Sequence, residues 1–204
     1  MMLTDPAIIR DALGFDDMTD INDAIEAALY AATQAIAARL NTSFDRAPHT
    51  DTWYVMEPLR HDNFLRQTEF RTRYGFVQSL DAISYGSEIS HFGTSDATDA
   101  SSSVTLQGEK GVIVDLKTDY TAKFVRAEYT YGFEADDDYP GVYDGTQVPT
   151  WLKEAAKLNA LVLLANNPAL DQADVTIDAR THQRTLEHIL SQHARYTPLA
   201  LLPL

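Results

Sequence analysis

Residues 125–165 read VRAEYTYGFEADDDYPGVYDGTQVPTWLKEAAKLNALVLLA, and this stretch predicts a strand, an acidic loop and a helix in that order. Every second residue from Val125 to Tyr131 is apolar or aromatic, which is the period of a strand with one buried face. Gly132 ends this strand. Pro149 suits the first turn of a helix because its missing N–H has no helical partner there. The helix that follows, from Trp151 to Ala165, is too apolar for a lone surface helix, so we expect it to be covered on more than one side.

The loop between this strand and this helix is acidic. Arg126 and Lys153 bound a stretch without basic residues, in which the acids are Glu128, Glu134, Asp136, Asp137, Asp138 and Asp144. Because like charges repel, the loop is predicted to be solvated and extended. Its three consecutive aspartates lack the alternating acids of a calcium loop, which favours a solvated charge run over a metal site.

Composition bounds the function further. A chain of 204 residues fits one domain with an insertion, or a small domain with arms. The absence of cysteine excludes disulfides, thiolate catalysis and cysteine metal ligands. The first residues lack a signal-peptide pattern. The longest apolar stretch, 158–165, is far shorter than the ~20 residues of a membrane span, so no membrane partner is expected.

The formal charge of -14 argues against wrapping nucleic acid, which needs clustered lysine and arginine. The charge is uneven, however. From residue 180 to the end, the only acidic side chain is Glu187. The basic or titratable residues of this segment are Arg180, Arg184, Arg195, His182, His188 and His193. An acidic body with a mildly basic, apolar-ended tail suggests a tail that meets another protein.

Helical patterns are predicted at both ends of the chain. Thr4-Asp5-Pro6 caps a short helix over 5–13, and apolar residues at helical spacing predict a longer, alanine-rich helix over 20–40. A third helix is expected over 149–165 and a last one over 178–195, with a narrow apolar stripe.

Between the helices the pattern changes to the period of strands. The predicted strands are Thr52–Met56, Glu69–Tyr74, Val77–Tyr85, Ser103–Gln107, Val112–Leu116 and Lys123–Tyr131. The stretch 86–102 is rich in Ser, Thr, Asp and Gly and is predicted to be a mobile loop.

No pattern of catalytic residues emerges. The chain has no G-x-S-x-G elbow, no S-x-x-K and no phosphate-binding glycine loop. His182, His188 and His193 are spaced by six and five residues, which puts them on different helix faces rather than around a metal. We therefore expect no enzyme activity, no metal and no cofactor.

The apolar C-terminal segment has two interpretations. Its leucines either fold back on the chain's own core or dock into a neighbouring protein, where an extended strand adds to a sheet edge.

This order of elements resembles the head-tail connector (adaptor, or head completion) family of tailed bacteriophages. The residues that carry the resemblance are Ile25-Glu26-Ala27-Ala28, Thr52-Trp53-Tyr54-Val55, Val77-Gln78-Ser79-Leu80 with Ile83 and Tyr85, Tyr129-Thr130-Tyr131-Gly132, and Val148-Pro149. Two features depart from the family pattern. Arg73-Tyr74-Gly75-Phe76 stands where prolines are expected, and the chain continues past the last family-like helix.

For the fold, we expect an α+β protein with a mainly helical bundle core, a β-sheet insertion over 50–131 and an extended C-terminal arm. The connector-like domain would span 1–178, with helices 5–13, 20–40 and 149–165. Residues 179–204 would form the C-terminal helix and the apolar arm.

For the function, the resemblance implies a virion structural protein of the neck, at the head-tail interface, that is assembled in the host cytoplasm. It would form a ring, by family habit of twelve copies, beneath the portal, extend the DNA channel and provide a platform for the tail. Its partners would be the portal protein, its own copies, a downstream neck or tail protein and double-stranded DNA in passage.

Two groups of residues are candidate sites for these contacts. The portal-docking set is Arg180, Arg184, Arg195, Tyr196, Leu199, Leu201, Leu202 and Leu204. The acidic set, at the channel or its rim, is Glu134, Asp136, Asp137 and Asp138, because an acidic lumen repels DNA. An outward acidic loop that contacts the next tail component is equally compatible with the sequence.

Two alternatives remain open. Another neck component, such as a stopper or tail-completion protein, would also form rings but tends to be richer in strands. A monomeric acidic ligand-binding module or hydrolase belongs to a different class and would need a concave pocket.

Overall fold

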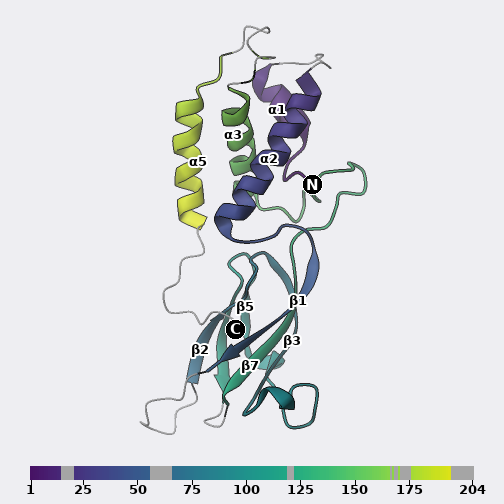
Figure 1. The fold of residues 1–204 in the computed structure, drawn as a ribbon, viewed down its shortest axis with the longest axis vertical. Coiled ribbons are helices and arrows are strands. Elements are labelled where there is room, and N and C mark those ends of the chain that lie inside the picture. Colours follow the sequence, from purple (N-terminus) through teal and green to yellow (C-terminus); the bar gives the residue numbers. More distant parts are fainter. Residues whose placement is uncertain are drawn as a thin grey trace. The chain divides into compact units, whose positions relative to one another are not determined.

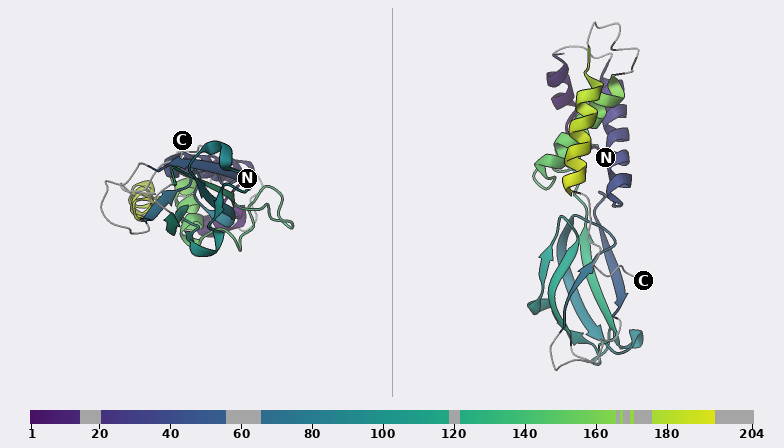
Figure 2. Two further views of the ribbon diagram at one scale, coloured as in Figure 1. Left: turned by 90° about the horizontal axis from the view of Figure 1, so that it is seen from below. Right: turned by 90° about the vertical axis from the view of Figure 1, so that its left-hand side faces the viewer.

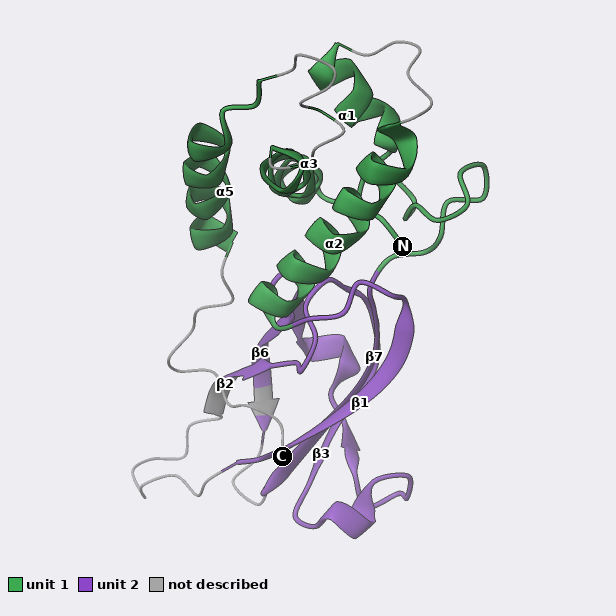
Figure 3. Cartoon of the chain, turned by 45° about the horizontal axis from the view of Figure 1, so that its top comes forward, with its two compact units in different colours: residues 1–41, 133–194 green, residues 42–132, 195–204 purple. Residues whose placement is uncertain are grey.

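The computed structural model describes residues 1–14, 21–55, 66–118, 122–165, 167, 170 and 176–193. Within these residues the chain forms a helical unit and a β unit (Figures 1 and 3). Unit 1 consists of residues 1–41 and 133–193, and unit 2 of residues 42–132. The extended C-terminal arm predicted from the sequence lies outside the described residues.

Unit 1 contains α1 (Pro6–Leu13), α2 (Asn22–Leu40), α3 (Thr150–Leu164) and α5 (Ala179–His193). Local chemistry explains where these helices begin and end. The Asp5 carboxylate accepts a hydrogen bond from the backbone N–H of Ala7 at 2.7 Å, which caps α1. Asn41 ends α2 in the left-handed conformation, a backbone geometry that asparagine tolerates better than most residues.

Helix α3 packs against both α2 and α5 (Figure 1). It buries Leu152, Ala155, Ala156, Leu158, Ala160, Leu161 and Leu164. Leu161 and Leu164 join Ile25 and Leu29 of α2 in one hydrophobic core. The expectation that this apolar helix is covered on more than one side is therefore confirmed.

Unit 2 is built from antiparallel strands. They are β1 (Ala47–Tyr54), β2 (Arg66–Arg71), β3 (Val77–Gly86), β4 (Thr98–Asp99), β5 (Thr105–Gln107), β6 (Val112–Thr118) and β7 (Phe124–Tyr131). Among the described residues, one sheet has the order β1-β7-β3-β4 and the other the order β2-β6-β5. Figure 2 shows the strands twisted around a common interior.

The two sheets share one hydrophobic core. Trp53, Ile83, Val125 and Tyr129 come from the first sheet, and the second contributes Phe70, Ile113 and Leu116. The alternation that predicts strand β7 is confirmed, because its residues at odd positions from 125 to 131 are buried.

The prediction of a mainly helical bundle core is wrong. The helical core and the β core are separate clusters of buried side chains. The physical reason is that period-two apolar residues give each sheet a face that must be covered, and the two sheets cover each other. The β segment is thus a unit with its own core.

The stretch 86–102, predicted to be a mobile loop, contains regular structure. A 3₁₀ turn at Ile89–His91 precedes β4, which pairs with β3. The guanidinium of Arg126 on β7 lies 4.7 Å from the centre of the Phe92 ring. This stretch is therefore ordered by a cation–π pair and by short-range hydrogen bonds. The loop prediction rested on the small number of large apolar residues, which does not report such contacts.

Gly132 permits the close turn that ends β7. Its φ is +80°, and a Cβ added there would lie 2.5 Å from the carbonyl oxygen of Asp45. Gly93 has a similar φ of +89° but has nothing within 4 Å of its added Cβ. An alanine at Gly93 would bear only the cost of the left-handed backbone, whereas an alanine at Gly132 would also clash with backbone atoms. Comparing the two substitutions therefore isolates the cost of the clash.

Gly132→Ala is expected to destabilise the protein far more than Gly93→Ala. The left-handed conformation costs about 1–2 kcal/mol at either position, and the backbone clash at Gly132 should add about 3 kcal/mol or more. Urea unfolding followed by tryptophan fluorescence measures both. Equal losses for the two variants would contradict this account of Gly132.

Candidate functional site

The predicted acidic residues lie on a folded hairpin in unit 1. We call residues 134–144 the acidic hairpin. The backbone N–H of Asp136 donates to the carbonyl of Val142 at 2.9 Å, and that of Asp144 donates to the carbonyl of Glu134 at 2.9 Å. An antiparallel bridge between Ala135 and Tyr143 lies between these bonds.

The N-terminus holds the hairpin in place. The backbone N–H of Met2 donates to the carbonyl of Gly141 at 2.7 Å, and the N–H of Tyr143 donates to the carbonyl of Met2 at 2.9 Å. The prediction of an extended loop is therefore wrong. Backbone pairing with a distant segment outweighs charge repulsion among side chains that solvent screens.

Two carboxylates of the hairpin order its turns. One oxygen of Asp136 accepts the N–H groups of Asp138 at 2.9 Å and of Tyr139 at 3.1 Å. Hydrogen bonds from the backbone and side chain of Thr146 hold the pKa of Asp144 below its usual range. Tyr139 is 59% exposed.

The acids of the hairpin line an open hollow of about 700 Å³.

Among the residues that the structure describes, no group of three or more acidic or histidine side chains is arranged to hold a metal ion. In the described part of the chain, no helix has the length and hydropathy to cross a membrane.

The predicted portal-docking set is divided. Arg180 and Arg184 lie on α5, and both are exposed. Arg195, Tyr196, Leu199, Leu201, Leu202 and Leu204 lie outside the described residues.

Helix α5 packs on α3 and is bonded to α2. Leu186 and Leu190 are buried. The guanidinium of Arg39 on α2 donates to both carboxylate oxygens of Glu187, one of them at 2.6 Å. This bond lowers the pKa of Glu187 and raises the pKa of Arg39.

The histidines of α5 do not form a site. His193 stacks on Trp151 of α3, with ring centres 3.9 Å apart. His188 lies 3.0 Å from Gln192 one turn away, and His182 donates its backbone N–H to Asp178. The ring of His193 thus serves packing between two helices.

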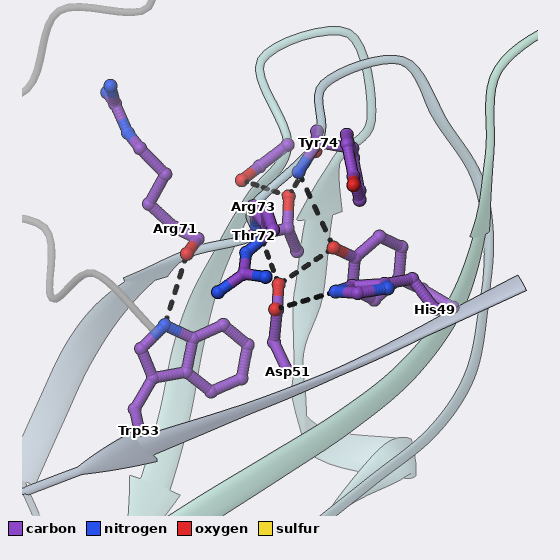
Figure 4. Close-up of polar contacts among 9 residues, drawn as sticks. His49, Asp51, Trp53, Arg71, Thr72, Arg73 and Tyr74 are labelled. Carbon is purple, nitrogen blue, oxygen red and sulfur yellow. Dashed lines mark hydrogen bonds and ion pairs between the residues drawn. The ribbon is translucent and has the colours of Figure 1, made fainter. Parts of the chain in front are cut away.

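A buried carboxylate in unit 2 was not anticipated from the sequence. Asp51 on β1 is 2% exposed, and Figure 4 shows the groups around it. Its carboxylate accepts the Tyr129 hydroxyl at 2.7 Å and the backbone N–H of Arg73 at 2.6 Å. Nε2 of His49 lies 3.2 Å from its other oxygen. The available signal was its position two residues before Trp53, on the inward face of the strand.

Side chains of β1 thereby bond to the backbone at the end of β2. Trp53 donates its indole N–H to the carbonyl of Arg71 at 3.1 Å, while Asp51 accepts from Arg73 two residues further along. Next to this cluster, the rings of Tyr74 and Tyr131 stack 4.1 Å apart. Burial raises the pKa of Tyr131, and the neighbouring Tyr74 adds to the effect. The arrangement joins β1 to the end of β2 and gives a buried carboxyl group its hydrogen-bond partners.

No protein-family model matches the chain, and no curated protein matches it. Among solved structures, a chain of a virion of a native gene transfer agent particle is similar, with a TM-score of 0.42 and 18% identity over 77% of this chain and 75% of that chain. A neck chain of an empty particle gives a TM-score of 0.38 and 16% identity over 78% and 80%. A neck chain of the native particle, computed with C12 symmetry, gives 0.37 and 16% over 78% and 79%. These values describe a distant likeness.

Asp51→Ala is expected to destabilise the protein by about 3 kcal/mol, because it leaves the Arg73 N–H and the Tyr129 hydroxyl without their buried acceptor. Tyr129→Phe removes one hydrogen bond and should cost about 1 kcal/mol. Urea unfolding measures both. Asp81→Ala, at an exposed acid of β3, is the control, and a similar loss there would refute a special role for Asp51.

Arg39→Gln is expected to weaken the attachment of α5 by about 0.5 kcal/mol at pH 7, the usual size for an exposed ion pair. Because the folded state lowers the pKa of Glu187, this contribution is present above the unfolded pKa and is lost as the pH falls through the folded one. Hydrogen exchange of the α5 amides at pH 7, and thermal unfolding at pH 7 and at about pH 3, measure the effect. Arg180→Gln should change neither, and an effect of Arg39→Gln that persists in acid would contradict the assignment.

Proposed function

We propose that this chain is a structural protein of the neck of a phage-like particle. Copies of it form a ring next to the portal, extend the channel for DNA and provide a platform for the next neck or tail protein. The protein acts by assembly and not by catalysis.

The observation that carries this proposal is the placement of the segments that resemble the connector family. Ile25–Ala28 lies within α2, and Val77–Leu80 begins β3. Tyr129–Gly132 ends β7, and Val148-Pro149 immediately precedes α3. These segments lie in, or directly beside, separate helices and strands. This agreement supports a connector-type protein.

The acidic hairpin fits a position near passing DNA. Glu134, Asp137 and Asp138 are exposed, and the backbone bonds of the hairpin hold them on one ordered surface. Fixed carboxylates repel phosphates and keep DNA from adhering to the channel. A hairpin that faces the next neck component would use the same exposed charges.

For the portal contact, we propose residues 195–204. This segment combines Arg195 and Tyr196 with four leucines and has no acidic side chain. Tyrosine and arginine are common anchors in protein interfaces, and the leucines supply apolar area. One residue, Ala194, separates this segment from the end of α5.

A ligand-binding module is the candidate from a different class. One observation favours it, an open hollow of about 500 Å³ that is lined by Pro48, His49, Thr50, Asp81, Glu128 and Tyr129. Asp81 already accepts hydrogen bonds from Ser79 at 2.8 Å and Thr130 at 3.2 Å. A module of this kind would not need a ring or a portal.

Removal of residues 196–204 is expected to abolish portal binding while the protomer stays folded. The measurement is co-sedimentation of the purified protein with rings of the portal protein from the same particle, with electron microscopy of the bound fraction. Circular dichroism of the truncated protein controls for folding. Failure of the full-length chain to sediment with the portal would count against a connector and favour the binding module.

A further inference from the structure

Helix α5 has one face in contact with α2 and α3, and on its opposite side exposed residues lie in a row. Leu186 and Leu190 face the core, and Glu187 is paired with Arg39. Arg180, Arg184 and His188 are exposed and follow one another at intervals of four residues, so they lie in a row along the helix. We call this row the basic face of α5.

The acidic hairpin is complementary to this face in charge and in chemistry. It presents Asp137 and Asp138 beside Tyr139, which is 59% exposed. Carboxylates form charge-assisted hydrogen bonds with arginine, and a tyrosine ring offers a face on which a guanidinium stacks. An arginine row is therefore a suitable partner for the tip of the hairpin.

The two surfaces do not meet within one chain. Both belong to unit 1, where the helices α2 and α3 lie between α5 and the hairpin (Figures 1 and 2). A contact between them thus requires two copies. Because the two patches differ, such a contact is head-to-tail, and it closes into a ring when the rotation between copies permits.

We propose that the basic face of α5 in one copy binds the acidic hairpin of the next copy, and that this contact joins neighbouring protomers. The inference rests on the proposed ring and names the surfaces that build it. It gives Arg180 and Arg184 a role between copies, separate from the portal contact of residues 195–204.

Both surfaces are ordered before they meet. The hairpin is held by the N-terminal segment through Met2, and α5 is held by Leu186, Leu190 and the Arg39–Glu187 pair. Little conformational entropy is lost when preformed surfaces associate. Since the charges are exposed, the contact should weaken as salt screens them.

Cysteine cross-linking tests this contact directly, because the natural chain contains no cysteine. The variant Pro140→Cys/Thr185→Cys places thiols on the hairpin tip and beside Arg184. On oxidation it should give a ladder of covalent oligomers, whereas an equimolar mixture of the two single variants should give only a dimer with one copy of each. The ladder should fade in about 1 M salt.

The matched control is Pro140→Cys/Ala27→Cys, in which the second thiol lies on the exposed side of α2. This control should stay monomeric on oxidation. Absence of a ladder from the test pair, or an equal ladder from the control pair, would overturn the proposal.

Charge reversal gives an independent measurement. Arg180→Glu/Arg184→Glu and Asp137→Lys/Asp138→Lys should each weaken self-association about tenfold or more in sedimentation velocity at low salt. An equimolar mixture of the two variants should restore it, because each then offers the other a complementary surface. Asp23→Lys/Glu26→Lys, which reverses exposed acids of α2, is the control and should leave association unchanged.

The portal assay separates this inference from the proposed function. Normal association of Arg180→Glu/Arg184→Glu copies together with lost portal binding would overturn the contact between copies and return these arginines to the portal. We expect the Arg180→Glu/Arg184→Glu variant to lose self-association, and the wild-type chain to co-sediment with the portal. A wild-type chain that neither self-associates nor cross-links would overturn the contact, whatever the portal assay gives.

Discussion

Hydrogen bonding of β7 on both of its edges is the constraint on which the β unit depends. β7 pairs with β1 along its whole length and with β3 on its other side, so its backbone groups are satisfied only when all three strands are in register. At its end, Gly132 donates its N–H to the carbonyl of Phe76 at 3.0 Å, where a side chain would collide with the backbone of Asp45. The strand therefore has to stop there, and the chain leaves the β unit at that residue.

The protein is built on two different solutions to the burial of apolar surface. In unit 1, alanine and leucine on α2 and α3 allow helices to pack closely, and in unit 2 two sheets cover each other. The buried Asp51 belongs to the second solution. It occupies an inward position where an apolar residue would normally stand, and it links β1 to the backbone after β2 through acceptor bonds that an apolar side chain cannot make.

In unit 1, groups of opposite charge lie on separate surfaces. The chain is strongly acidic as a whole. In unit 1, helix α5, which carries the exposed Arg180 and Arg184, lies on one side of α2 and α3, and the acidic hairpin lies on the other (Figure 1). A chain with separated surfaces of opposite charge carries the two patches that a head-to-tail assembly requires. The proposed contact between copies follows from this separation of charge.

Local patterns in the sequence predicted the four described helices and all the described strands except β4, which lies in the stretch predicted to be a loop. Alternation predicted β7, helical spacing predicted α2, and Pro149 predicted the start of α3, because these signals depend on residues close together in the chain. The sequence also identified the acidic run at Glu134 and Asp136–Asp138, of which Glu134, Asp137 and Asp138 are exposed. Three features emerge only in the folded chain. The β segment has a core of its own, the acidic loop is a hairpin held by Met2, and Asp51 is buried beside Tyr129. These features depend on hydrogen bonds and packing between residues far apart in sequence, and neither periodicity nor composition carries information about which distant groups will meet.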